Sequence, residues 1–168
     1  MLKWIIPGFL PFVILTTGNN LALASNGVKA LADSSYSKSH NIIAINDGVK
    51  NGPGCYWAKV SWVSRAELKD HWVEVNFPEE VKVSQVKIIW GESHTEGKFF
   101  ASKEFSIQKF DQGDWTEIEK IAENPQWVEF TDIILEPQKV KRLRIYQYKV
   151  NGPEEVEDTM QISEIEVY

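Results

Sequence analysis

Asp47 and Gly48 are the first residues of the chain whose types could do chemistry together. They end the apolar run formed by residues 42–45 and open a loop that contains glycine and proline. An Asp-Gly pair in this position forms a tight turn, because glycine accepts positive φ and aspartate bonds to its own backbone. The Asp47 carboxylate could also hold another group, and its residue type leaves both interpretations open.

Cys55 is the one thiol of the chain, and its chemistry depends on its neighbours. A single cysteine forms no internal disulfide. A catalytic thiol needs a nearby base, and the sequence offers none in a recognisable pattern, so we interpret Cys55 as a small buried hydrophobic residue. The sequence also lacks the HExxH, GxSxG, P-loop and dinucleotide-binding motifs, and we therefore expect no enzymatic activity.

Three polar segments, 59–71, 91–102 and 149–159, carry side chains that could bind a ligand. Trp62 lies among polar residues, where its ring could stack on the apolar face of a sugar. The alternating pattern VSWVS suits an ordinary sandwich residue equally well. The residues expected to form a small polar and aromatic patch are Trp62, Arg65, His71, His94, Phe99 and Phe100. A solvated loop surface is the simpler alternative.

The charge of the chain limits its partners. Its 18 Lys and Arg residues are outnumbered by 24 Asp and Glu residues, which gives a formal net charge of −6. An acidic surface repels phosphate groups, so we expect neither nucleic acid nor an anionic lipid surface as a partner. We expect the domain to be a monomer.

Residues 1–24 have the composition of a secretory signal peptide. Lys3 supplies a short positive region, an apolar stretch follows, and Ala22-Leu23-Ala24 forms a small-x-small cleavage site. A membrane anchor is the alternative, but the uncharged stretch over residues 4–17 is short for a span and is interrupted by proline. We therefore expect cleavage before Ser25, no membrane span in the mature chain, and a secreted, periplasmic or cell-surface location.

The rest of the chain shows the period-two alternation of β-strands. Turn signals such as DQGD at 111–114 and NGP at 151–153 separate the alternating runs, and no sustained helical stripe interrupts them. The segments expected to form strands are residues 71–77, 83–90, 103–110, 114–120, 126–135, 140–148 and 160–168. This pattern is typical of an all-β sandwich or barrel, and we expect one domain over residues 25–168.

Several of these segments resemble, in order, the discoidin or coagulation factor 5/8 type C superfamily. They are the loop from Ala44 to Trp57 with its AINDG start, WVEVNF at 72–77, VSQVKIIWG at 83–91, FSIQKFDQGDWTEI at 105–118, VKRLRIYQY at 140–148 and ISEIEVY at 162–168. Each motif is weak alone, and it is their order and spacing that make the resemblance specific. The resemblance implies an antiparallel β-sandwich of the galactose-binding-like jelly-roll type, in a domain that is ordinarily not catalytic.

The resemblance also implies a structural cation. Members of the superfamily often tie the loop after the first strand to the last strand through one Ca²⁺. The matching carboxylates here are those of Asp47 and Glu164, with the carbonyls of Ala44, Val49 and Ser163 as further candidates. Oxygen ligands of this kind suit a hard cation. The chain departs from the family at Cys55, which stands near the position of a Ser or Thr ligand, because a thiol binds Ca²⁺ poorly.

A binding function follows from the same resemblance. Members that bind sugars hold them in loops at one end of the sandwich, so we expect a glycan or polysaccharide at the polar and aromatic patch. The alternative is a protein-interaction or adhesion domain with a cell-surface or secreted protein as its partner. A glycan site would have an exposed aromatic side chain flanked by hydrogen-bonding groups, whereas a protein site would have a larger and flatter apolar patch.

Overall fold

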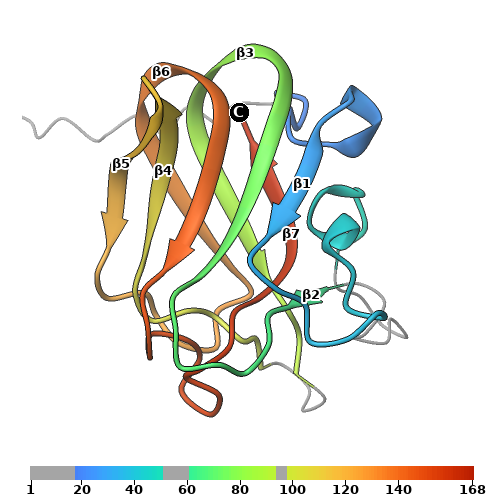
Figure 1. Cartoon of the computed structure of the whole chain (residues 1–168), viewed down its shortest axis with the longest axis vertical. Coiled ribbons are helices and arrows are strands. Elements are labelled where there is room, and N and C mark those ends of the chain that lie inside the picture. Colours follow the sequence, from blue (N-terminus) through green and yellow to red (C-terminus); the bar gives the residue numbers. More distant parts are fainter. Residues whose placement is uncertain (1–17, 51–60, 94–97) are drawn as a thin grey trace, which may run out of the picture.

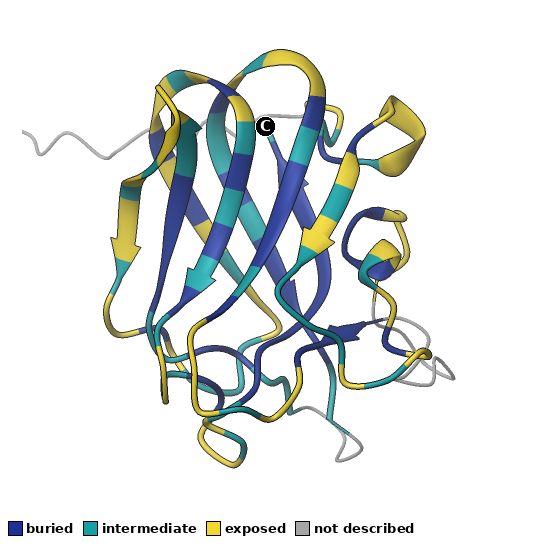
Figure 2. Ribbon diagram, viewed as in Figure 1, coloured by how far each residue is buried: buried dark blue, intermediate teal, exposed yellow. Residues whose placement is uncertain are grey.

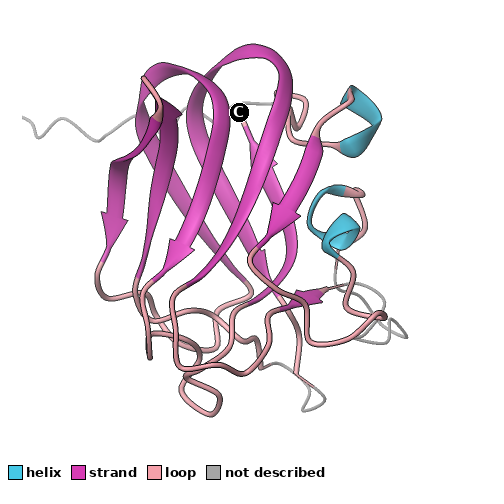
Figure 3. Ribbon diagram, in the orientation of Figure 1, coloured by secondary structure: helices cyan, strands magenta, loops and turns pink. Residues whose placement is uncertain are grey.

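The computed structural model describes residues 18–50, 61–93 and 98–168, and its regular structure is mainly β-strand (Figures 1 and 3). The strands are β1 (Lys29–Ala32), β2 (Trp62–Val63), β3 (His71–Trp90), β4 (Phe105–Asp111), β5 (Asp114–Ile121), β6 (Phe130–Gln147) and β7 (Gln161–Val167). Two short 3₁₀ helices, η1 (Ala24–Asn26) and η2 (Ile42–Asn46), precede β2. Within the described ranges, no helix combines the length and the apolar character needed to cross a membrane.

Strands β3 and β6 are long enough to take part in both layers of a sandwich. They pair antiparallel along almost their whole length, with a shift in register between Asn76 and Val81. Pro78 lies in this shift, where its missing N–H removes no ladder hydrogen bond. Both strands bend over the upper end of the molecule in Figure 1. Because of this bend, the strand order β2-β7-β3-β6-β4-β5, with β1 paired to β3, forms two layers.

All strand pairs are antiparallel, as the alternating sequence predicts. One layer contains β1, the first half of β3, the second half of β6, β4 and β5; the other contains β2, β7 and the remaining halves of β3 and β6. The predicted hairpin at DQGD is also confirmed, since it joins β4 to β5. Gln112 and Gly113 both have positive φ, 51° and 94°, as a tight hairpin turn requires.

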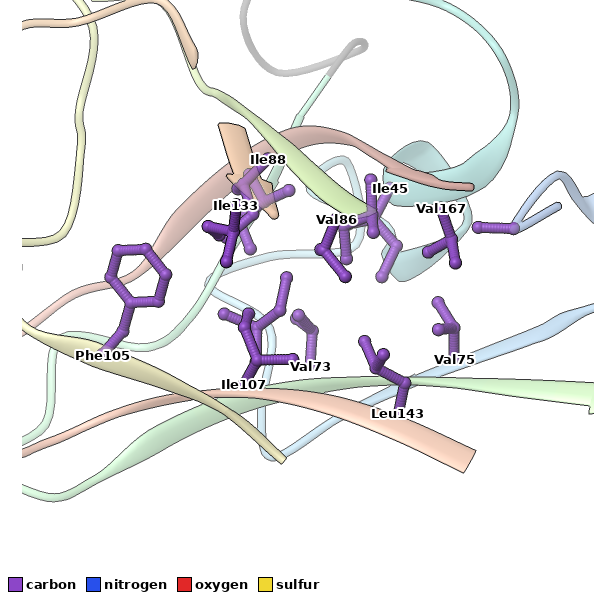
Figure 4. Packing of buried hydrophobic residues seen from close by; sticks show 14 of the residues in the cluster. Ile45, Val73, Val75, Val86, Ile88, Phe105, Ile107, Ile133, Leu143 and Val167 are labelled. Atoms are coloured by element: carbon purple, nitrogen blue, oxygen red, sulfur yellow. The ribbon is translucent and has the colours of Figure 1, made fainter. Parts of the chain in front are cut away.

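Apolar side chains from the two layers face each other and form one core. Along β3, Val73 and Val75 belong to one layer, and Val86 and Ile88 belong to the other (Figure 4). Burial alternates along β1 and along much of β6 because successive residues point to opposite faces (Figure 2). Strand β7 differs, since all its residues are buried. The helix η2 and the N-terminal segment pack against it.

The packed part of the chain begins before the predicted domain boundary at Ser25. Ala22 is fully buried in the core, and the Leu21 amide donates a hydrogen bond to the Val167 carbonyl oxygen at 2.9 Å. The fold therefore includes residues that the sequence analysis assigned to the signal peptide. The small-x-small pattern specifies only side-chain size, and small residues are equally suited to close packing.

Candidate functional site

Several loops meet at one end of the sandwich, the lower end in Figure 1, which we call the loop end. Its described parts lie in residues 64–70, 91–93, 98–104, 122–129 and 148–160. Backbone hydrogen bonds connect these loops. The Glu67 amide donates to the Asp158 carbonyl oxygen at 3.2 Å, and the Lys103 amide donates to that of Asn151 at 2.7 Å. The described parts of the three segments expected to carry ligand-binding residues therefore lie together.

The loop of residues 148–160 has a compact shape that depends on Gly152. The Gly152 amide donates to the Glu157 carbonyl oxygen at 3.1 Å. A Cβ atom at Gly152 would lie 2.3 Å from the carbonyl oxygen of Thr159 and 2.8 Å from that of Glu157, distances that no other residue tolerates. This turn fixes the loop in the middle of the loop end, where it contacts the loops on both sides.

Phe100 and Trp127 form an aromatic pair at the loop end. Their ring centres are 6.4 Å apart with an interplanar angle of 55°, and both side chains are half-buried. The ammonium group of Lys98 lies 4.6 Å from the centre of the Trp127 ring and 3.1 Å from Glu155 Oε1. One small area thus contains two aromatic rings, a cation and a carboxylate, contributed by three different loops.

Trp127 has a backbone conformation that bulky residues rarely adopt. Its φ is 64°, in the left-handed region, which is unfavourable for a side chain with a Cβ. Hydrogen bonds from other loops hold the segment in place: the Glu154 amide donates to Gln126 Oε1 at 3.0 Å, and Asn124 Nδ2 donates to the Ser102 carbonyl oxygen at 2.9 Å. Strain of this kind persists only where the surroundings enforce it, and it is concentrated at ligand sites.

Trp62 corrects one prediction of the sequence analysis. Its side chain has 0% exposure, and its Nε1 donates to the Ser34 carbonyl oxygen at 2.9 Å and to Ser35 Oγ at 3.1 Å. A ring without exposed surface cannot stack on a ligand. Trp62 is instead the ordinary sandwich residue that its alternating neighbours also predict.

His71 is likewise a buried structural residue rather than a ligand contact. Its exposure is 0%, Nδ1 lies 2.9 Å from Asp33 Oδ2, and Nε2 lies 3.0 Å from the Asp158 carbonyl oxygen. Burial lowers the pKa of His71, but the hydrogen bond and charge of Asp33, with the Asp158 and Glu67 carbonyls, raise it above its ordinary value. The ring connects Asp33, next to the end of β1, to the loop end from inside.

The other predicted ligand residues have different surroundings. Arg65 is exposed, and its Nη1 lies 3.9 Å from Glu67 Oε1, a distance at which a surface pair contributes little. Phe99 packs in part against the core, whereas Phe100 contacts Trp127. His94 lies outside the described residues.

Trp127 was missed because the sequence analysis placed it in a strand. The alternation in QWVEFTDIIL predicts a strand over residues 126–135, but β6 begins only at Phe130, which leaves Trp127 in the preceding loop. The pair Asn124-Pro125 was a usable signal, since proline and asparagine favour turns and displace the start of a strand. Period-two patterns locate a strand better than they locate its first residue.

A second polar cluster, which we call the terminal junction, is formed by Asn20, Asp47, Gly48 and Glu164. Glu164 has 0% exposure; its Oε2 accepts from the Gly48 amide at 3.2 Å, and its Oε1 accepts from Asn20 Nδ2 at 3.4 Å. Burial raises the pKa of Glu164 to about 8; the Gly48 hydrogen bond opposes this shift, and the charges of Asp47 and Glu166 add to it. The charge of Lys50 also opposes the shift, but its ammonium group pairs with Glu166 Oε1 at 2.6 Å rather than with Glu164.

The donor atoms of the terminal junction are of the type that suits a hard cation. Carboxylate and carbonyl oxygens are the ligands that Ca²⁺ prefers, and a cation would relieve the repulsion between Glu164 and Asp47 that contributes to the raised pKa. Nowhere in residues 18–50, 61–93 and 98–168 do three or more His, Cys, Asp or Glu residues gather as a metal site. A cation here would depend on two carboxylates and on main-chain carbonyls, such as the predicted ones of Ala44, Val49 and Ser163.

A second aromatic group, the sheet-face cluster, lies on β4, β5 and β6 and consists of Phe110, Trp115, Arg142 and Arg144. The guanidinium of Arg142 lies 4.1 Å from the ring centre of Phe110 and 5.1 Å from that of Trp115. That of Arg144 lies 4.1 Å from the Trp115 ring centre. These rings lie on regular strands and are stacked by arginines of the neighbouring strand, so their role in packing the sheet face is complete without a ligand.

The sequence and the fold both have known counterparts. Residues 29–162 match the family model of the F5/8 type C domain, which covers most of the chain, and the chain therefore belongs to this family. No curated protein sequence matches the chain.

Three solved structures illustrate the fold match. Chitosan-binding module 1 of a chitosanase/glucanase from Paenibacillus sp. IK-5 is 22% identical, with a TM-score of 0.66, 90% of this chain covered and 99% of that one. The family 32 module of NanJ from Clostridium perfringens, solved with galactose, is 18% identical, with a TM-score of 0.62 and coverages of 88% and 97%. A GalNAc-β-1,3-galactose complex of CpGH89CBM32-5 from Clostridium perfringens is 12% identical, with a TM-score of 0.66 and coverages of 89% and 99%. At these identities the matches establish a shared fold.

Proposed function

We propose that this F5/8 type C domain is a non-catalytic carbohydrate-binding module that holds its ligand at the loop end. The observation that carries the proposal is the half-buried pair of Phe100 and Trp127 beside the charged groups of Lys98 and Glu155. Proteins of the same fold that are named for chitosan, or were solved with chitotriose or galactose, support a glycan as the class of ligand.

The arrangement can recognise a sugar in two ways at once. The C–H face of a pyranose can pack on the Trp127 ring, which removes apolar surface of both from water. The Lys98 ammonium can donate to a sugar hydroxyl, and the Glu155 carboxylate can accept from one. Because the loops are fixed by hydrogen bonds before the ligand arrives, little conformational entropy is lost on binding.

The proposal is tested by a glycan screen of residues 19–168, followed by calorimetric titration with the best ligand. We expect at least one glycan to bind, and we expect Trp127→Ala to weaken that binding. Trp115→Ala is the matched control, since it removes a half-buried tryptophan of the sheet-face cluster. If no glycan binds, the proposal fails and a protein partner becomes the better hypothesis; if both variants bind as the wild type does, the ligand site lies elsewhere.

For the terminal junction we propose a structural Ca²⁺ held by Asp47 and Glu164. The cation would add positive charge directly beside the buried Glu164 carboxylate, where Lys50 is paired with Glu166 instead, and it would tie the loop after η2 to β7. Support comes from the oxygen donors, the burial of Glu164 and its raised pKa. The role is structural, because the cluster is separate from the hydrogen-bonded loops that position Trp127.

A further inference from the structure

Asn20 connects the N-terminal segment to the last strand. Its Oδ1 accepts hydrogen bonds from the Ala22 amide at 2.9 Å and from the Val167 amide at 3.0 Å. Its Nδ2 donates to the Ile165 carbonyl oxygen at 3.3 Å. Since Val167 is fully buried, removal of Asn20 would deprive its amide of this partner inside the protein, which costs more free energy than such a bond ordinarily contributes.

Ala22 is part of the core and supports another buried polar group. Its side chain has 0% exposure and belongs to the hydrophobic core. Its carbonyl oxygen accepts from Asn46 Nδ2 at 3.0 Å, and Asn46 is itself 2% exposed. Loss of Ala22 would therefore open the core and weaken the hydrogen bonding of a buried amide, two changes that destabilise proteins.

Two small-x-small patterns lie closest after the apolar N-terminal stretch of the sequence. One is Thr16-Thr17-Gly18 and the other is Ala22-Leu23-Ala24. Both satisfy the size rule for removal of a secretory leader. The fold distinguishes them, because a cut after Ala24 removes Asn20 and Ala22, whereas a cut after Gly18 removes neither. Gly18 and Asn19 are exposed, while Ala24 and Ser25 lie within η1.

We infer that export processing hydrolyses the peptide bond between Gly18 and Asn19. Water adds across this bond under catalysis by the leader peptidase of the export machinery, leaving a carboxylate on Gly18 and a free α-amine on Asn19. The inference rests on the predicted signal peptide and is independent of the proposed glycan site. The mature chain is then residues 19–168, which retains every contact of Asn20 and Ala22.

The direct test is N-terminal sequencing and intact-mass analysis of the protein secreted by a bacterial host that expresses the full chain. We expect the sequence Asn-Asn-Leu-Ala-Leu-Ala at the mature N-terminus. A mature N-terminus at Ser25, or a chain that keeps its first residues, would overturn the inference.

Two substitutions at exposed residues identify which peptide bond is cleaved. Leader peptidases require a small residue directly before the cut, so Gly18→Leu is expected to accumulate precursor, whereas Ala24→Leu is expected to be processed as the wild type is. Both residues are exposed, and a Cβ at Gly18 would meet only the side chain of Tyr168, at 3.3 Å, which makes the two variants comparable. The opposite pattern, with processing blocked only by Ala24→Leu, would show that the cut follows Ala24.

A stability measurement tests the packing argument separately. Residues 19–168 and residues 25–168 are produced without a leader and compared by thermal unfolding. We expect residues 25–168 to melt at least about 5 °C lower or to remain unfolded, because they lack the core side chain of Ala22 and the Asn20 hydrogen bonds. Equal melting temperatures would remove the reason for preferring the cut at Gly18.

Discussion

The loop end and the terminal junction both join segments that are far apart in sequence, but they differ in how their functional groups are satisfied. At the junction, Glu164 is buried and hydrogen-bonded to the Gly48 amide and Asn20 within the fold, and Asp47 is exposed. At the loop end, Phe100 and Trp127 are half-buried, and the side chains of Lys98 and Glu155 are 41% and 55% exposed.

This difference separates a cluster that stabilises the fold from one that can bind. Inward-facing groups must find partners within the protein, because an unsatisfied buried polar group is costly. Outward-facing groups retain surface that a ligand can cover. The same rule explains why Trp62 and His71, whose residue types suggested binding, have structural roles.

The largest expected effect concerns calcium at the terminal junction. At a Ca²⁺ concentration one hundred times its Kd, the wild type should gain about 2.7 kcal/mol of stability, which raises the melting temperature by roughly 5–10 °C. Glu164→Gln should lose this gain, while Glu119→Gln, an exposed change on β5, should keep it. A calcium-dependent increase that survives in Glu164→Gln would contradict the assignment. Because the proposed cation lies at the terminal junction and not at the loop end, a chelator should leave the glycan affinity unchanged.

The next effect is that of Trp127→Ala on glycan affinity. Truncation of a tryptophan at the centre of a binding site commonly costs about 2 kcal/mol or more, so we expect at least a tenfold increase in Kd by calorimetry, about 1.4 kcal/mol. The melting temperature should change little, because Trp127 lies outside the core. Trp115→Ala should show the reverse, with a lower melting temperature and an unchanged Kd. If both variants lost glycan affinity equally, the loop end could not be distinguished from the sheet-face cluster as the binding site.

The pH dependence of stability tests the hydrogen bonds that His71 forms with Asp33 and with the loop carbonyls of Glu67 and Asp158. The folded-state pKa of His71 is raised, so its contribution is complete below its ordinary value of 6.5 and is lost as the pH rises through the raised pKa. Burial raises the pKa of Asp33, but its hydrogen bonds from His71, the Trp72 amide and Ser34 lower it more. The Asp33 contribution is therefore present above 3.8 and is lost as the pH falls through the lowered pKa.

Chemical unfolding at a series of pH values measures this dependence. Stability from the pair should be greatest between the two ordinary pKa values and should fall on the order of 1 kcal/mol toward higher pH. Lys69 and Glu67, which surround Asp33 and the ring, keep their charges in this window. His71→Gln should flatten the decline above pH 6.5, and an unchanged profile in that variant would show that another group causes it.

The smallest expected effect is that of the exposed pair of Lys98 and Glu155. Surface ion pairs contribute between about 0 and 1 kcal/mol, so Glu155→Gln should leave the melting temperature within a degree or two of the wild type. Its effect should be visible in glycan affinity, by a few-fold, if Glu155 accepts a sugar hydroxyl. Unchanged affinity would restrict the site to the aromatic pair.

Much of the scaffold could be predicted from local patterns. The alternation over residues 71–77 correctly predicted a strand there, and DQGD was correctly identified as the turn between two strands. These features depend on the period of a strand and on the conformational preferences of turn residues, both of which act between neighbours in sequence.

The candidate site could be predicted only in part. Three of the segments that form the loop end were identified, but the loop of residues 122–129 was missed, and the side chains assigned to the ligand were partly wrong. Trp62 and Trp127 are the same residue type in similar alternating surroundings, and the alternation does not distinguish the fully buried ring from the half-buried one. The N-terminal boundary stays a prediction for a related reason, because Ala22 suits a cleavage site and a packed core equally well.

The sequence by itself determined an all-β domain and the turns between many of its strands, because strand periodicity and turn chemistry are local. Tertiary structure alone decided which loop residues meet. Lys98, Trp127 and Glu155 become neighbours only after β3 and β6 bend and cross between the layers, since burial and proximity are properties of the packed chain.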